Sequence, residues 1–155
     1  MERFCTEGNV SSAPPVTPID LTQFAEIIDN ARTDNNSAVV ASANGAFPDL
    51  GFKGSLMVWD RDHLAWWERT LRETYAAIQA NPHVAVLVRN PTRDRRTIRM
   101  YGDASVVADP DLRERIWDRV VQVEKDTDKE KKGQAVIVRV DRVRAGLEAV
   151  QQRGA

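Results

Sequence analysis

The chain has 155 residues, of which 42% are apolar and 29% charged. That is enough for one hydrophobic core and too little for two ordinary domains. The 22 basic and 23 acidic residues nearly cancel, so the chain as a whole has no field that attracts nucleic acid or anionic lipid. We therefore expect one domain whose partners include neither nucleic acid nor a membrane.

The short apolar runs argue against a membrane-spanning protein, and the scarcity of metal-ligating residues argues against a metalloprotein. Apolar runs such as residues 38–43 and 135–138 are far shorter than the ~20 residues that cross a bilayer. The N-terminus also lacks a basic-then-apolar signal pattern, so we expect a cytoplasmic protein. Cys5 is the only cysteine, and His63 and His83 are the only histidines, which predicts no disulfide within the chain and no metal site.

The first 18 residues contain five Ser and Pro residues without an apolar period, which is typical of an extended or disordered arm. Residues 19–155 then form the predicted domain. Asp20 is placed to cap a helix, and apolar residues recur after it at helical spacing up to Ala31. The polar run 34–37 ends this helix.

Strand patterns follow from residue 38. Residues 38–42 predict a first strand, Asn44-Gly45 a tight turn and 52–59 a second strand. A turn at 60–62, a third strand at 63–67, a helix at 70–80 ended by Asn81-Pro82, and a fourth strand at 83–89 come next.

The second half of the domain repeats this alternation. A polar loop at 90–96 precedes a long strand at 97–107, and Asp109 is placed to cap a helix that begins at Pro110. The run 124–132 is too charged to bury, while residues 134–140 predict a sixth strand and 143–150 a terminal helix. Six strands joined mostly by hairpins predict a mainly β (α+β) fold, an antiparallel barrel with flanking helices.

Motifs for hydrolytic chemistry are absent from the sequence. It contains neither a Gly-x-Ser-x-Gly elbow nor a Gly-rich phosphate loop. His63 lies beside a turn and His83 at the start of a strand, positions typical of surface or edge histidines. The sequence therefore identifies no catalytic residue.

A series of weak motifs in a fixed order is more informative. The chain reads Pro-x-x-x-x-Lys-Gly-Ser at 48–55, Asp-x-Asp-x-Leu at 60–64 and Asn-Pro-x-Val-Ala-Val at 81–86, followed by strand-like residues 101–107 and 135–141. In this order the motifs resemble the pyridoxamine 5′-phosphate oxidase-like family over about residues 37–144. The resemblance implies a six-stranded antiparallel split β-barrel and a homodimer that holds FMN in grooves between its subunits.

The residues for such a site lie in two segments. Lys53 and Ser55 are two residues apart on a predicted strand and therefore share one face. Residues 69–74 lie at the start of the following helix, where free N–H groups favour phosphate. Trp66, beside the site, adds a flat apolar surface. The predicted cofactor-binding residues are Lys53, Gly54, Ser55, Trp67, Arg69, Thr70, Arg72 and Thr74. In the alternative interpretation Lys53 is solvated, Arg69 and Arg72 pair with Glu68 and Glu73, and one tryptophan belongs to the core.

The sequence departs from the family in two places. Glu73 and Thr74 stand where the family commonly has a basic residue, and residues 146–153 do not match its basic substrate segment. We therefore expect an FMN-dependent oxidoreductase that acts on a small planar organic molecule other than vitamin B6, with electrons from NAD(P)H. The alternatives are a deazaflavin-dependent reductase and a noncatalytic flavin- or heme-binding or interaction module. In such a module Arg93, Arg95, Arg96 and Arg99 would form a local basic surface; otherwise they belong to a solvated hairpin loop.

Overall fold

The computed structural model describes residues 12–45 and 47–155. In chain order its helices are a short 3-10 helix at Leu21–Phe24, α1 (Ala25–Asp29), α2 (Glu73–Ala80), α3 (Pro110–Arg119) and α4 (Gln122–Lys125). Its strands are β1 (Val16–Thr17), β2 (Ala38–Ala43), β3 (Pro48–Lys53), β4 (Met57–Val58), β5 (His63–Glu68), β6 (His83–Arg89), β7 (Thr97–Val106), β8 (Gln134–Ala145) and β9 (Ala149–Gln152).

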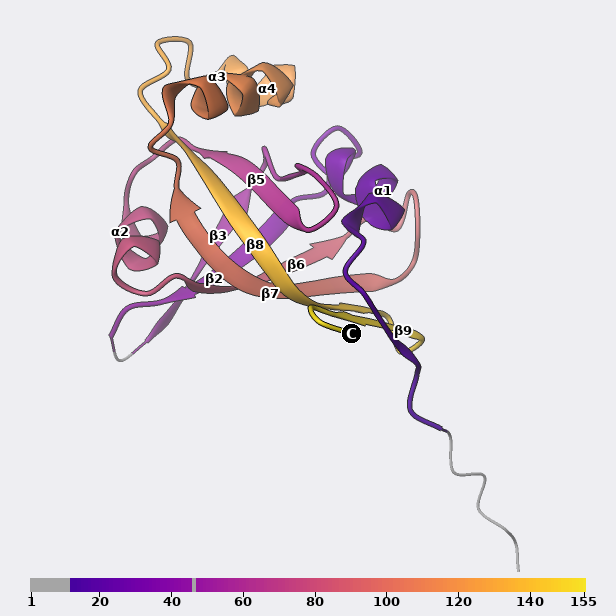
Figure 1. The fold of residues 1–155 in the computed structure, drawn as a ribbon. Helices are drawn as coiled ribbons and strands as arrows, with labels where there is room; N and C mark the ends of the chain where they lie inside the picture. Colours follow the sequence, from indigo (N-terminus) through magenta and orange to yellow (C-terminus); the bar gives the residue numbers. More distant parts are fainter. Residues whose placement is uncertain (1–11, 46) are drawn as a thin grey trace, which may run out of the picture.

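The described strands form one sheet of nine strands, in the order β1-β9-β8-β7-β6-β2-β3. β8 is the branch point, because its first half also pairs with β5, which in turn pairs with β4. All pairings are antiparallel except the short β1–β9 contact, and no ladder joins β3 to β4 or β5, so the barrel is not closed. The predicted mainly β split barrel with flanking helices is confirmed, with three short strands added to the six expected (Figure 1).

The predicted terminal helix at 143–150 is wrong. β8 continues to Ala145, Gly146 turns the chain with a φ of +59°, and β9 returns along β8. A bulge explains the error: Tyr101 pairs with Arg142 and Gly102 with Val140, so Asp141 is an extra residue in β8. The bulge places buried Val140 and Val143 three apart, which imitates helical spacing.

Two other expectations need adjustment. The predicted strand 52–59 divides into β3 and β4, because residues 54–56 turn between them. In the predicted arm, residues 1–11 lie outside the described part, while Val16 and Thr17 pair with β9. None of the described helices is long and apolar enough to span a bilayer.

Two apolar clusters lie on opposite faces of β5. Since neighbouring residues of a strand point to opposite faces, Trp66 enters the barrel core while Trp67 packs in the second cluster, with Ile116 and Trp117 of α3. Both tryptophans are buried. α3 therefore covers the outside of β5 and β8 at one end of the sheet.

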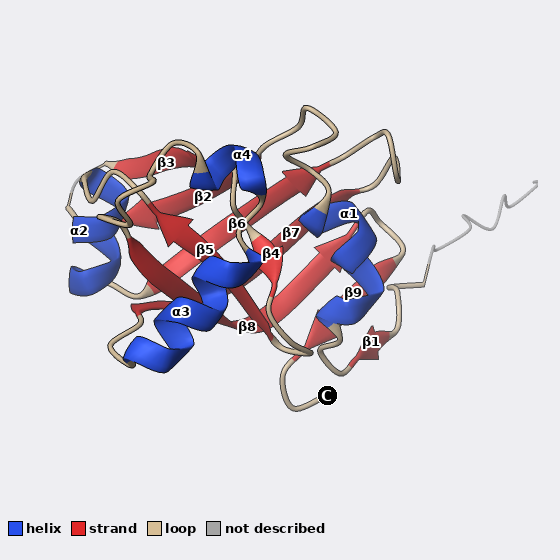
Figure 2. Ribbon diagram, turned by 90° about the horizontal axis from the view of Figure 1, so that it is seen from above, coloured by secondary structure: helices blue, strands red, loops and turns tan. Residues whose placement is uncertain are grey.

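The face of β2, β3 and β6 that points away from the core is open. Figure 2, seen from above, shows the helices in front of the sheet, and no described helix covers its other face. Leu50 and Phe52 on β3 are 71% and 78% exposed, and Leu87 on β6 is 40% exposed. We call this surface, with Phe47 of the hairpin, the outer apolar patch.

Candidate functional site

Six of the eight predicted cofactor residues come together around one small hollow, at the junction of β3 and the end of β5. We call it the Lys53 hollow; its volume is about 70 Å³. It is lined by Phe52, Lys53, Gly54, Ser55, Trp67, Glu68, Arg69, Thr70 and Glu124. The two other predicted residues do not line it: Arg72 is the exposed N-cap of α2, and Thr74 is buried with Oγ1 3.5 Å from Asp49 Oδ2.

Lys53 is neither solvated nor free in this hollow. Its Nζ lies 2.8 Å from Glu68 Oε2, and the side chains are 8% and 3% exposed. The same oxygen accepts a hydrogen bond of 2.8 Å from the Trp66 indole. The positive charge at Lys53 is therefore matched by a carboxylate that the sequence interpretation did not pair with it.

Ser55 and Trp67 are engaged in holding the fold. Ser55 Oγ accepts a hydrogen bond from the Trp67 backbone N–H at 2.9 Å and donates one to the Trp67 carbonyl at 3.2 Å. The Trp67 ring packs edge to face on Trp117, with centroids 4.7 Å apart, and its Nε1 donates to Asp128 Oδ2 at 2.8 Å. Since Trp66 and Trp67 are 0% and 5% exposed, neither offers an open ring face to a ligand.

Asp128 is buried, although it belongs to the run that was expected to stay in solvent. Burial opposes its ionisation, but hydrogen bonds from the Trp67 indole and from the backbone N–H groups of Gly133 and Lys132 outweigh that effect. They hold the pKa of the carboxyl below its usual range. The ionised Asp128 thus stabilises the fold, because it connects the loop before β8 to Trp67 through these hydrogen bonds.

A phosphate dianion needs cations or N–H and O–H donors that are not already engaged. The Lys53 hollow offers exposed Arg69 at its rim, but Lys53 is paired and Ser55 is bonded to the backbone. Glu68 is the partner of Lys53, and Glu124 is paired with Arg32 Nε at 2.8 Å, so Arg69 is the one cation lining the hollow for which no ion pair is found among the described residues. As these side chains stand, the hollow does not fit a phosphate dianion, and the assignment of cofactor contacts to it stays a prediction.

A larger hollow lies on the outer face of the sheet. It has a volume of about 440 Å³ and is lined mainly by small and apolar residues: Ala41, Ser42, Ala43, Pro48, His83, Val84, Ala85, Tyr101, Gly102, Asp103 and Asp141. We call it the apolar hollow. Its lining is largely apolar and includes the Tyr101 ring, which is the composition of a site for a planar ring. The sequence signal for it is alanine at the outward positions Ala41 and Ala43 of β2 and Ala85 of β6.

His83 lines this hollow, and its side chain is 79% exposed, in agreement with the surface position that the sequence predicts. Its Nδ1 is 2.6 Å from Asp103 Oδ1, and Asp103 Oδ2 is 3.1 Å from Arg139 Nη2. A carboxylate at one ring nitrogen fixes the orientation of an imidazole and leaves the other nitrogen for a ligand. The sequence interpretation had not paired His83 with Asp103, because 20 residues separate them.

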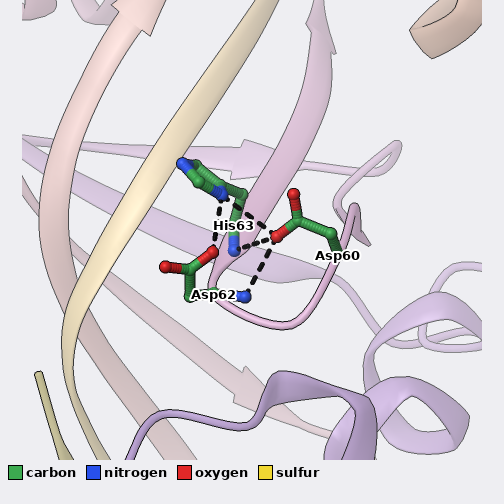
Figure 3. Close-up of side chains that lie close together, drawn as sticks. All are labelled: Asp60, Asp62 and His63. Atoms are coloured by element: carbon green, nitrogen blue, oxygen red, sulfur yellow. Dashed lines mark hydrogen bonds and ion pairs between the residues drawn. The ribbon is translucent and has the colours of Figure 1, made fainter.

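The other histidine belongs to an acidic group in the turn between β4 and β5 (Figure 3). His63 Nδ1 lies 3.0 Å from Asp60 Oδ1 and 2.9 Å from Asp62 Oδ1. Asp60 Oδ1 also accepts the backbone N–H groups of Asp62 and His63, and Asp62 pairs with Arg153 at 2.8 Å. These contacts close the turn, and we assign no ion to the group.

Comparisons with known proteins agree with this fold. The family model described as pyridoxamine 5′-phosphate oxidase matches residues 24–145. No curated protein matches the chain. Among solved structures, HupZ from Group A Streptococcus shares 20% identity and a TM-score of 0.62, covering 81% of this chain and 93% of its own.

Two further structures have the same fold. A putative pyridoxamine 5′-phosphate oxidase from Lactobacillus delbrueckii is 24% identical, with a TM-score of 0.57 and coverage of 76% of this chain and 90% of its own. An FMN-binding protein from Syntrophomonas wolfei is 14% identical, with a TM-score of 0.59 and coverage of 80% and 86%. At these identities the likeness concerns the fold.

Proposed function

Because the chain belongs to the pyridoxamine 5′-phosphate oxidase family, we propose that it is an FMN-dependent oxidoreductase that acts on a small planar organic molecule. The observation that carries the proposal is the family match over residues 24–145, which includes every strand from β2 to β8. A neighbour of the same fold is an FMN-binding protein. The apolar hollow supports the proposal with a surface suited to a flat ring.

We propose further that the protein acts as a homodimer through the outer apolar patch. Trp66 and Trp67 are buried, so the apolar surface available to a second copy is that of Phe47, Leu50, Phe52 and Leu87, which are 87%, 71%, 78% and 40% exposed. A contiguous apolar surface of this kind marks an interface, and a two-fold dimer is the commonest oligomer. A second copy would also close the apolar hollow against water.

Redox chemistry of an organic substrate requires a proton as well as electrons. We propose that His83 holds that proton at the apolar hollow; the contact of its Nδ1 with Asp103 supports this role. We propose a reduced nicotinamide as the source of electrons. The cofactor supplies the redox chemistry, and the protein positions the reactants.

The test begins with the absorbance spectrum of the purified protein, with and without added FMN. The flavin-loaded protein is then titrated anaerobically with NADH and NADPH and reoxidised with quinones, nitroaromatics and oxygen. We expect reduction and reoxidation faster than those of free FMN. His83→Gln, compared with the wild type at equal flavin occupancy, should turn over planar acceptors more slowly.

Other results would select the alternatives. A Soret band indicates a heme-binding module, and reduction only of an added deazaflavin indicates a deazaflavin-dependent reductase. If flavin binds but is reduced and reoxidised no faster than free FMN, the protein is a noncatalytic flavin-binding module. Failure of all three chromophores to bind contradicts the proposed function altogether.

A further inference from the structure

A second cavity on the outer face is lined largely by arginines. Its volume is about 510 Å³, and it lies between the β6–β7 loop, β7 and the end of β8. Its lining is Arg95, Arg96, Thr97, Arg99, Tyr101, Arg142, Arg144, Gly146 and Leu147. We call it the arginine cavity.

The sheet brings these arginines together from distant parts of the sequence. Arg99 of β7 is directly opposite Arg144 of β8, and Tyr101 is opposite Arg142. Like charges directly opposite each other in a sheet are destabilising. The fold therefore concentrates positive charge at a cost to its own stability, and a bound anion would relieve that repulsion.

The carboxylates nearby leave most of this charge unmatched. Asp94 pairs with Arg96 at 2.8 Å, and Glu148 adds a weaker attraction to the same guanidinium. Within residues 12–45 and 47–155, no carboxylate oxygen lies within 4.0 Å of the four other arginines, which are Arg95, Arg99, Arg142 and Arg144. The four arginines that the alternative function grouped into one basic surface are thus divided, since Arg93 pairs with Glu26 and Asp34 instead.

Tyr101 connects the arginine cavity with the apolar hollow, because it lines both. In the ladders it stands between Ala85 of β6 and Arg142 of β8. Adjacent strands are about 4.8 Å apart, so a ring over Ala85 lies within roughly 10 Å of the Arg142 backbone. A planar ring and an anionic group of one small molecule fit this spacing.

We propose that the arginine cavity binds the phosphate or diphosphate of a ligand whose planar ring lies in the apolar hollow against Tyr101. Guanidinium groups match phosphate oxygens with paired N–H donors. The Lys53 hollow is the poorer phosphate site, because its lysine is already paired with Glu68. Two ligands have this combination of a phosphate and a planar ring: FMN itself and a nucleotide that donates electrons. The inference rests on the proposed function only where FMN is the ligand.

The first test is calorimetric titration of the flavin-free protein with inorganic pyrophosphate. We expect Arg142→Gln/Arg144→Gln to bind it at least about tenfold more weakly than the wild type, because each lost charge-assisted hydrogen bond is worth about a factor of ten. The control, Arg61→Gln/Arg115→Gln, removes two exposed arginines elsewhere and should change binding less than about twofold. Equal binding by all three proteins would overturn the proposal.

Thermal unfolding gives a second readout that requires no flavin. Without anion, Arg144→Gln should be at least as stable as the wild type, since it relieves the repulsion with Arg99. Pyrophosphate should raise the Tm of the wild type and not that of the double variant. If the double variant instead weakens self-association and leaves the pyrophosphate response intact, the arginines serve the dimer contact and the proposal is wrong.

Matched ligand pairs then separate the two ligands. For FMN against riboflavin and for ADP against adenosine, the wild type should prefer the phosphorylated member, and Arg142→Gln/Arg144→Gln should lose that preference. Arg69→Gln/Arg72→Gln, which removes the exposed arginine that lines the Lys53 hollow and the exposed arginine that caps α2, should retain it. The inference would be contradicted if only Arg69→Gln/Arg72→Gln lost the preference for FMN over riboflavin and the wild type showed no preference for ADP over adenosine.

Discussion

Lys53 and Glu68 form a buried ion pair, with Nζ 2.8 Å from Oε2, between the end of β3 and the end of β5. These strands are not hydrogen-bonded to each other. The pair therefore joins the two sides of the opening in the split barrel. Its charges are desolvated, so removing one of them leaves the other buried and uncompensated.

The first prediction concerns this pair. Lys53→Met and Glu68→Gln should each lower the free energy of unfolding by about 3 kcal/mol or more, while the double variant should lose much less than the sum. Urea denaturation measures the coupling. The exposed Lys132 and Glu130 pair, with side chains 77% and 72% exposed, serves as the control and should show almost no coupling. Additive losses at Lys53 and Glu68 would contradict the buried pair.

The second prediction is a pH dependence from Asp128. Its folded pKa is lowered, so the ionised carboxylate stabilises the fold above the unfolded pKa of about 3.9. That contribution is lost as the pH falls through the folded value. Asp128→Asn should cost about 2 kcal/mol at pH 7, and its difference from the wild type should shrink on acidification. A difference that stays constant between pH 7 and pH 3 would show that the charge is not the cause.

The third prediction concerns Gly102, at the bulge between β7 and β8. A Cβ at this position would overlap the carbonyl oxygen of Arg139, which is backbone and cannot turn aside. Gly102→Ala should therefore lower the free energy of unfolding by about 1 to 3 kcal/mol. Ser105→Ala, at an exposed position of the same strand, should change it by less than about 0.5 kcal/mol. Equal stability of the two variants would show that the strands separate easily.

The fourth prediction tests the proposed dimer. Sedimentation at micromolar concentration should give about twice the chain mass of 17.4 kDa, and Phe52→Glu should give single chains because it places a charge in the outer apolar patch. Val123→Glu, on the 40% exposed valine of α4, should remain dimeric. A wild type that sediments as single chains, with or without FMN, would refute the dimer.

The sequence alone determined the elements whose signals are local. Asp109 and Pro110 mark the start of α3 with a capping carboxylate and a residue that needs no N–H partner there. Asn81-Pro82 ends α2 and starts β6, which runs from His83 to Arg89 as predicted. The same local motifs, in their order along the chain, were sufficient to identify the family.

The tertiary structure decided which charges meet, because those contacts depend on strand register. Lys53 finds Glu68 and His83 finds Asp103 only after β3, β5, β6 and β7 have taken their places. Arg99 meets Arg144 in the same way, through a ladder shifted by the bulge at Tyr101 and Gly102. A shift of one residue in the pairing would turn every side chain of β8 to the opposite face of the sheet. The local sequence of β8 does not show that Asp141 is the extra residue at the bulge.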